Sequence, residues 1–255
     1  MDLFDQIAVV TGGASGIGAA VVDELRASGA KPVVWDVAGA VDVTCDVTDP
    51  AQVAAAMRRT RAIAGRPTML VASAGVVAGT ELLQLELDEW DRVFAVNLRG
   101  ALICMKAFAE DVVEAGHAGS ILAMSSVNSV VSDAGLAAYS ASKAGLNALV
   151  KIAAVEWGKH QIRVNAVGPG VTRTPMVRFG SDPRYLENLS ARTPLGDIGE
   201  PRQVAQAALN ILRSDWITGQ VVMVDGGSSL MTARSAWWNA RDATRLSPQE
   251  EATSS

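Results

Sequence analysis

Residues 7–29 read IAVVTGGASGIGAAVVDELRASG, in which a short apolar run, a glycine-rich turn and a helical pattern follow one another directly. Glycine permits a tight turn over residues 12–18 and lets the backbone approach a bound phosphate closely. The free N–H groups and the positive dipole end of the following helix favour an anion at the same place. A glycine trio alone is a weak signal, but its position between a strand and a helix predicts a phosphate-binding loop rather than an ordinary turn.

Apolar runs of strand length alternate with helical stretches along almost the whole chain. Continuous apolar strands are typical of a parallel sheet that is covered on both faces. The sequence therefore predicts an α/β fold with a doubly wound, seven-stranded parallel sheet and helices on both faces. The predicted strands are 7–12, 32–36, 41–45, 68–75, 119–126, 162–170 and 220–227. The predicted helices are 16–29, 49–64, 88–114, 136–158 and 201–213.

The link between the second and third predicted strands is short. Only about four residues separate PVVWD (32–36) from VDVTC (41–45), whereas a crossover connection needs about a dozen or more. Either the third strand pairs by another route, or a helix that is usual at this place has been lost.

Composition and charge exclude several classes of protein. The chain has 255 residues, 49% of them hydrophobic and 19% charged, so neither disorder nor a coiled coil describes it as a whole. Its 22 basic and 27 acidic residues give a net charge of −5, which argues against a nucleic-acid partner. No apolar run is long enough to span a membrane, and the acidic N-terminus lacks the basic region of a secretory signal. We therefore expect a cytoplasmic protein.

The residues that most often bind transition metals are few in this chain. The two cysteines and the two histidines lack the spacing of a metal site, and no disulfide framework is possible with so few cysteines. These residues are Cys45, Cys104, His117 and His160. No metal is expected.

Asp36 ends the second predicted strand, 18 positions beyond Gly18. A carboxylate at this place can accept hydrogen bonds from both ribose hydroxyls of adenosine, and it repels a 2′-phosphate. No lysine or arginine stands next to Asp36 to bind such a phosphate. The sequence therefore favours NAD over NADP, with a surface turn residue as the alternative interpretation.

Tyr139 and Lys143 are four residues apart in a predicted helix, so they share one face. A cation beside a phenol lowers the phenol pKa, which suits proton transfer near neutral pH. Ser126 ends the fifth predicted strand, and parallel sheets bind ligands at that end of their strands. A solvated helix face is the alternative for the pair, although the chain has only two tyrosines.

Together these residues resemble the short-chain dehydrogenase/reductase family, over about residues 5–228. The family's TGxxxGxG element corresponds to Thr11, Gly12, Gly16 and Gly18, and its Tyr-x-x-x-Lys element to Tyr139 and Lys143. The family's catalytic serine stands 13 residues before that tyrosine, which is Ser126 here. Further matches are Asn97 within VNLRG, Asp46-Val47, Pro169-Gly170 and Thr174.

The resemblance implies a single-domain Rossmann fold over residues 1–229 and a hydride-transfer site. Tyr139 would exchange a proton with the substrate oxygen, and Ser126 would hydrogen-bond that oxygen. Lys143 would lower the tyrosine pKa and bind the nicotinamide ribose, while Asn97 would hold a water for proton relay. The implied cofactor contacts are Gly12, Ser15, Gly16, Ile17, Gly18, Asp36, Asp46, Val47, Ser73, Ala74, Gly75, Tyr139, Lys143, Pro169, Gly170, Thr172 and Thr174.

One departure from the family affects the expected cofactor site. The family usually has Asn-Asn-Ala-Gly after the fourth strand, whereas this chain has Ala72-Ser73-Ala74-Gly75. Losing the amide at Ser73 removes a donor and an acceptor beside the cofactor. We expect an altered but functional site.

Residues 175–200 are expected to form an irregular substrate lid. The expected substrate contacts are Ser126, Asn128, Tyr139, Met176 and Phe179. The arginines of this segment contact an acid or a phosphate, or they are solvated. A hydroxylated ring, a steroid, a β-ketoacyl thioester and a sugar all remain open as substrates.

We expect an NAD(H)-dependent oxidoreductase that interconverts a secondary alcohol and a ketone. The alternatives are an NADP(H)-dependent 3-oxoacyl thioester reductase and a non-catalytic dinucleotide-binding protein. By the resemblance, the long helices at 88–114 and 136–158 form subunit interfaces of a homotetramer. The tail, residues 230–255, is expected to dock partly through Trp237 and Trp238, with a disordered tip.

Overall fold

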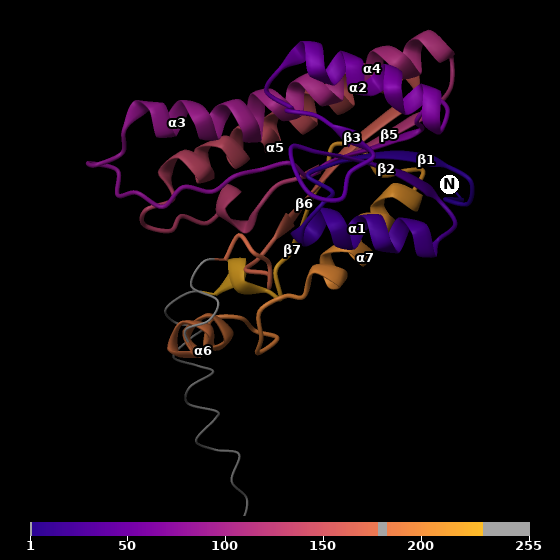
Figure 1. Ribbon diagram of the computed structural model, residues 1–255. Helices are drawn as coiled ribbons and strands as arrows, with labels where there is room; N and C mark the ends of the chain where they lie inside the picture. Colours follow the sequence, from indigo (N-terminus) through magenta and orange to yellow (C-terminus); the bar gives the residue numbers. More distant parts are fainter. Residues whose placement is uncertain (1, 178–182, 232–255) are drawn as a thin grey trace, which may run out of the picture.

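A sheet of seven parallel strands lies at the centre of the molecule, with the order β3-β2-β1-β4-β5-β6-β7 (Figure 1). The computed structural model describes residues 2–177 and 183–231. The strands are β1 (Ile7–Thr11), β2 (Lys31–Asp36), β3 (Val43–Thr44), β4 (Met69–Ala72), β5 (Gly119–Met124), β6 (Ile162–Pro169) and β7 (Val221–Val224). The strand order reverses between β1 and β4, which is where sheets of this kind form a ligand crevice at their carboxyl edge.

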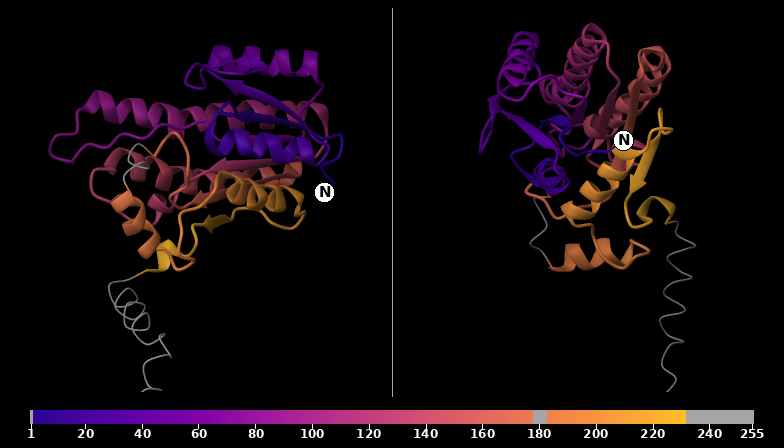
Figure 2. Two further views of the ribbon diagram at one scale, coloured as in Figure 1. Left: turned by 60° about the horizontal axis from the view of Figure 1, so that its bottom comes forward. Right: turned by 90° about the vertical axis from the view of Figure 1, so that its right-hand side faces the viewer.

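Helices cover both faces of the sheet. Helices α1 and α7 pack together on one face, and α2, α4 and α5 lie side by side on the other, as Figure 2 shows. The helices are α1 (Gly16–Ala27), α2 (Pro50–Ile63), α3 (Leu87–Phe94), α4 (Ala101–Ala115), α5 (Ala137–Trp157), α6 (Pro183–Ala191) and α7 (Pro201–Arg213). The predicted doubly wound, single-domain α/β architecture is confirmed.

Successive strand residues enter two separate cores. Val9 packs with Val33 and Leu70 beneath α2, α4 and α5, whereas its neighbours Ala8 and Val10 pack on the α1 and α7 side. All five side chains are at most 3% exposed. Because both faces of each strand are buried, the strands read as continuous apolar runs rather than as an alternating pattern.

The third strand is shorter than predicted, and the link between β2 and β3 contains no helix. Only Val43 and Thr44 pair with β2, in parallel. Asp42 explains the short link, because its N–H donates to the Val34 carbonyl at 3.1 Å and its carboxylate accepts from the Val34 N–H at 2.8 Å. β2 and β3 are therefore joined without a crossover helix, and β3 pairs in parallel with β2 at the edge of the sheet.

Two further expectations need correction. The predicted helix over 88–114 is α3, a π-helical segment (Ala95–Gly100) and α4 in succession. The segment 175–200 is not wholly irregular, since it contains α6, which begins at Pro183. A proline at the first helical position suits a helix start, because its φ is already near the helical value.

Trp237 and Trp238 lie outside the described residues, as does most of the tail. Within residues 2–177 and 183–231, no helix is long and apolar enough to cross a membrane.

Candidate active site

The glycine-rich loop between β1 and α1 lies tightly against the segment after β4. A Cβ on Gly18 would stand 2.1 Å from the Gly12 carbonyl oxygen, and one on Gly12 would stand 2.8 Å from the Ala74 backbone nitrogen. Thr11 strengthens this contact, because its hydroxyl oxygen accepts from the N–H groups of Ser73 and Ala74, both at 3.1 Å. The glycines are thus required by close backbone approach, and Ser73 is held through its main chain.

The start of α1 fits a phosphate group. Ser15 is the N-cap, its side chain makes no capping hydrogen bond, and the first turn, which includes Ile17, contains no acidic residue. The N–H groups there are available to an anion. Gly16 of the same turn lies next to Thr174, because a Cβ built on Gly16 would be 3.5 Å from the threonine side chain. The loop therefore meets the segment after β6.

Asp36 lies at the edge of the glycine-rich loop. Its carboxylate accepts from the Ala14 N–H at 3.1 Å and from the Val37 N–H at 2.8 Å. The half-buried carboxylate is therefore fixed beside the glycine-rich loop.

Asn97 lies in the π-helical segment between α3 and α4 and is 1% exposed. Its amide accepts from the Val76 N–H at 2.8 Å and donates to the Val76 carbonyl at 2.9 Å and to the Ser142 hydroxyl at 3.1 Å. These bonds tie the loop after β4 to α5. π-Helical turns within helices occur frequently at functional sites.

Ser126, Tyr139 and Lys143 meet at the carboxyl ends of β4 and β5. Ser126 follows β5, and its hydroxyl oxygen accepts from the Asn128 N–H at 3.1 Å. Lys143 is 4% exposed. Its Nζ donates to the Met124 carbonyl at 2.7 Å and lies 5.7 Å from the centre of the Tyr139 ring.

Gly75, in the loop after β4, lies close to both Asn97 and Lys143. A Cβ built there would lie 3.4 Å from Asn97 Oδ1 and 3.5 Å from Lys143 Nζ. The structure thus brings the four proposed catalytic residues together next to the glycine-rich loop.

Burial shifts the pKa values of both Tyr139 and Lys143. Burial raises the pKa of Tyr139, and a hydrogen bond with Ser126 only partly opposes this. Burial also lowers the pKa of Lys143 from 10.5 to about 8. In this arrangement burial dominates the Tyr139 pKa, and Lys143 Nζ donates to the Met124 carbonyl, so the lowering of the tyrosine pKa by Lys143 stays a prediction.

The remaining predicted cofactor contacts surround the same edge. Asp46 accepts from the Thr48 N–H at 2.9 Å and from its hydroxyl at 2.8 Å, and Val47 packs against Gly100. The Gly170 N–H continues the β6–β7 pairing past Pro169 by donating to Val224 at 3.0 Å. Thr172 is 4% exposed, and its hydroxyl donates to the Gly170 carbonyl at 3.0 Å, so this side chain supports the turn.

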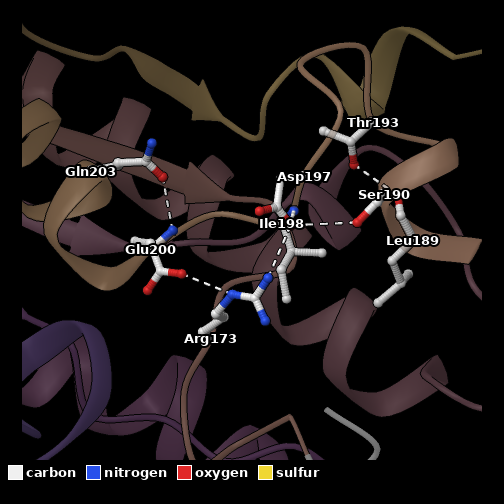
Figure 3. A network of polar contacts seen from close by, with 8 residues as sticks. All are labelled: Arg173, Leu189, Ser190, Thr193, Asp197, Ile198, Glu200 and Gln203. Carbon is white, nitrogen blue, oxygen red and sulfur yellow. Dashed lines mark hydrogen bonds and ion pairs between the residues drawn. The ribbon is translucent and has the colours of Figure 1, made fainter. Parts of the chain in front are cut away.

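Arg173, between two predicted contact residues, was missed by the sequence interpretation. Figure 3 shows its guanidinium reaching Asp197 at 3.0 Å and Glu200 at 2.8 Å. Backbone bonds join the same places, since the Arg173 N–H donates to Gly199 at 2.9 Å and the Gly199 N–H to Val171 at 2.9 Å. Both ends of the segment 174–198 are therefore fastened beside Thr174. The partners are more than 20 residues apart, and no sequence pattern marks such a contact.

The predicted substrate residues are only partly described. Asn128 is half-buried, and its side-chain amide donates to the Asp133 carboxylate at 2.8 Å. Met176 is 43% exposed, and Phe179 lies outside the described residues. The sequence interpretation missed Asp133 as the partner of Asn128, because the two residues meet only through the fold of the loop between them.

Comparisons with known proteins agree on one group. A family model described as enoyl-(acyl carrier protein) reductase matches residues 12–229. The chain is 38% identical to cis-4-hydroxycyclohexanecarboxylate dehydrogenase of Sinomonas cyclohexanicum, over 88% of this chain and 96% of the relative. It is 35% identical to (3R)-3-hydroxyacyl-CoA dehydrogenase of Canis lupus familiaris, over 87% of this chain and 95% of the relative. It also resembles the solved structure of a short-chain type dehydrogenase/reductase from Mycobacterium marinum, with a TM-score of 0.83, 30% identity, and coverage of 89% of this chain and 96% of that one.

Proposed function

Because this chain belongs to the short-chain dehydrogenase/reductase family, we propose that it interconverts a secondary alcohol and a ketone with NAD(H) as the cofactor. The family places the chain among oxidoreductases that use a nicotinamide dinucleotide and act on small molecules. The observation that carries the finer proposal is the meeting of Asn97 and Lys143 at Gly75, directly beside the glycine-rich loop.

In the proposed reaction, the protein positions the substrate and moves one proton. Ser126 donates a hydrogen bond to the substrate oxygen, and Tyr139 exchanges a proton with that oxygen. Lys143 binds the nicotinamide ribose, and Asn97 supports a water that connects Lys143 to solvent. The bound nicotinamide supplies hydride transfer to or from the carbinol carbon, which no side chain of the protein provides.

Asp36 supports NAD rather than NADP as the cofactor. Replacing Asp36 with alanine is expected to weaken NADH binding by about 1–3 kcal/mol, because a charge-assisted contact is lost, and to improve NADPH binding. Fluorescence titration with each nucleotide measures both dissociation constants. Asp23→Ala is the matched control, since it removes one exposed carboxylate from α1, and it should change neither constant. Equal NADH and NADPH affinities in the unaltered protein would contradict the proposal.

The substrate class is tested with two probes. Cis-4-hydroxycyclohexanecarboxylate with NAD⁺ tests a cyclic secondary alcohol, the class in the name of the Sinomonas relative. Acetoacetyl-CoA with NADPH tests the second candidate, a 3-oxoacyl thioester reductase, whose substrate class is the one in the name of the Canis relative. NADH formation with the first probe supports the proposal. Turnover of the thioester alone favours the second candidate, and nucleotide binding without turnover of either probe favours a non-catalytic protein.

We also propose that the chain forms a homotetramer. Its support is a set of apolar side chains exposed on α4 and α5. Leu102 is 39%, Val113 46%, Ile152 54% and Val155 83% exposed. Sedimentation of the purified protein decides the assembly, and a monomer at micromolar concentration would contradict it.

A further inference from the structure

We propose that Asn147 positions the Ser126 hydroxyl, by tying helix α5 to the loop that carries Ser126 independently of Lys143. Asn147 stands four residues after Lys143 on α5, so both side chains leave the same face of the helix. The proposal rests on the proposed function, in which Ser126 contacts the reacting oxygen.

Three hydrogen bonds connect Asn147 to both sides of Ser126. The Ser125 hydroxyl donates to Asn147 Oδ1 at 2.6 Å, and Asn147 Nδ2 donates to the Ser129 hydroxyl oxygen at 2.8 Å. The Ser129 hydroxyl in turn donates to the Ser126 carbonyl at 2.6 Å. The residue before Ser126 and the carbonyl of Ser126 itself are therefore both fixed to one side chain of α5.

The direction of these bonds requires a side chain at position 147 that both accepts and donates a hydrogen bond. Each serine hydroxyl has one proton to donate. Ser129 uses its proton on the Ser126 carbonyl and must accept a bond from elsewhere, while Ser125, which is 3% exposed, must find an acceptor. Only a side chain that accepts on one side and donates on the other satisfies both serines, and asparagine does so.

Lys143 holds Met124, the residue before Ser125, because its Nζ donates to the Met124 carbonyl at 2.7 Å. Successive turns of α5 thus fasten Met124, Ser125 and Ser126. The lysine contact uses the ammonium that the proposed reaction needs for the ribose, whereas the Asn147 amide is committed to the two serines. Asn147 therefore keeps Ser126 in register with Tyr139 whatever Lys143 binds.

The first test needs no substrate or cofactor. Asn147→Leu keeps the side-chain size and removes both polar atoms, so amide hydrogen exchange at Ser129, Val130 and Val131 should accelerate about tenfold or more. These N–H groups donate to Ser126 and Val127 at 3.0 Å in the turn that the amide stabilises. Asn210→Leu on the exposed side of α7 is the matched control and should leave this segment unchanged. Unchanged exchange in Asn147→Leu would overturn the proposal.

The second test separates positioning from folding. With cis-4-hydroxycyclohexanecarboxylate and NAD⁺, or with acetoacetyl-CoA and NADPH if only that probe reacts, Asn147→Leu should lower kcat about 10- to 100-fold. Its dissociation constant for the reduced nucleotide should stay within about twofold. Ser129→Ala interrupts the same chain of bonds without altering α5, so it should lower kcat in the same way. The double variant should be no slower than the slower single variant.

The outcomes separate this proposal from the proposed function. If Tyr139→Phe is inactive while Asn147→Leu and Ser129→Ala keep the unaltered kcat, the positioning role is wrong and the function stands. If Tyr139→Phe retains full turnover, the function fails, and accelerated exchange in Asn147→Leu then shows a structural tie without a catalytic role, which also overturns the proposal.

Discussion

Tyr139→Phe is expected to lower kcat about a thousandfold or more, while the dissociation constant for NADH stays within about twofold. In the proposed reaction the phenol exchanges the proton with the substrate oxygen, and general acid–base groups contribute about 10²- to 10⁴-fold. The ring remains, so the packing of α5 beside Ser126 is retained. Steady-state kinetics and a nucleotide titration on the same preparation measure both quantities. Turnover near that of the unaltered protein would exclude Tyr139 as the proton-transfer residue.

The pH dependence gives an independent check on Tyr139. Burial raises its pKa above the ordinary value of 10, so the phenol is protonated at neutral pH. Ketone reduction uses this protonated form directly, whereas alcohol oxidation needs the ionised form. Oxidation should therefore accelerate as the pH rises toward 10, while reduction should change little between pH 7 and 9 because the phenol stays protonated there. Oxidation that does not change between pH 7 and 10 would show that another group takes the proton.

The sequence predicted the central features of the fold because they depend on local patterns. The apolar run before Gly12, the proline at the start of α2 and the alternation of strands and helices each report on neighbouring residues. Glycines required by close backbone approach also left a readable motif. The spacing of Tyr139 and Lys143 was informative for the same reason, because four residues form about one helical turn.

Other features of the site depend on contacts between distant residues. Lys143 donates to a backbone carbonyl, which every residue possesses, so no residue type marks that acceptor. The amide of Asn147 meets Ser125, 22 positions away, because α5 packs on β6 and on the 3-10 turn Val127–Ser129 that follows β5. The π-helical segment that places Asn97 differs from a regular helix in its hydrogen bonds rather than in an obvious composition. These contacts become visible only when the elements are assembled.

Lys143→Met is expected to change the pH dependence of stability as well as to remove activity. Burial lowers the pKa of Lys143 from 10.5 to about 8 in the folded protein. Between pH 8 and 10.5 the unfolded chain therefore binds a proton that the folded protein has released, and the stability of the unaltered protein rises with pH. Relative to Lys143→Met, its free energy of unfolding should increase by up to about 3 kcal/mol across this window. Denaturant unfolding of both proteins at pH 7.5, 9 and 10.5 measures the difference.

The sign of this change distinguishes the burial of the ammonium from a stabilising ion pair. A lysine stabilised by a carboxylate would have a raised pKa, and the unaltered protein would then lose stability relative to Lys143→Met as the pH rises. Lys151→Met is the matched control, because it removes a lysine from the exposed side of the same helix without touching the buried site. A flat difference for Lys143→Met would mean that its ammonium is hydrated in the folded protein. The expected rise, together with loss of turnover, would show that the chain retains a destabilising buried cation because the reaction requires it.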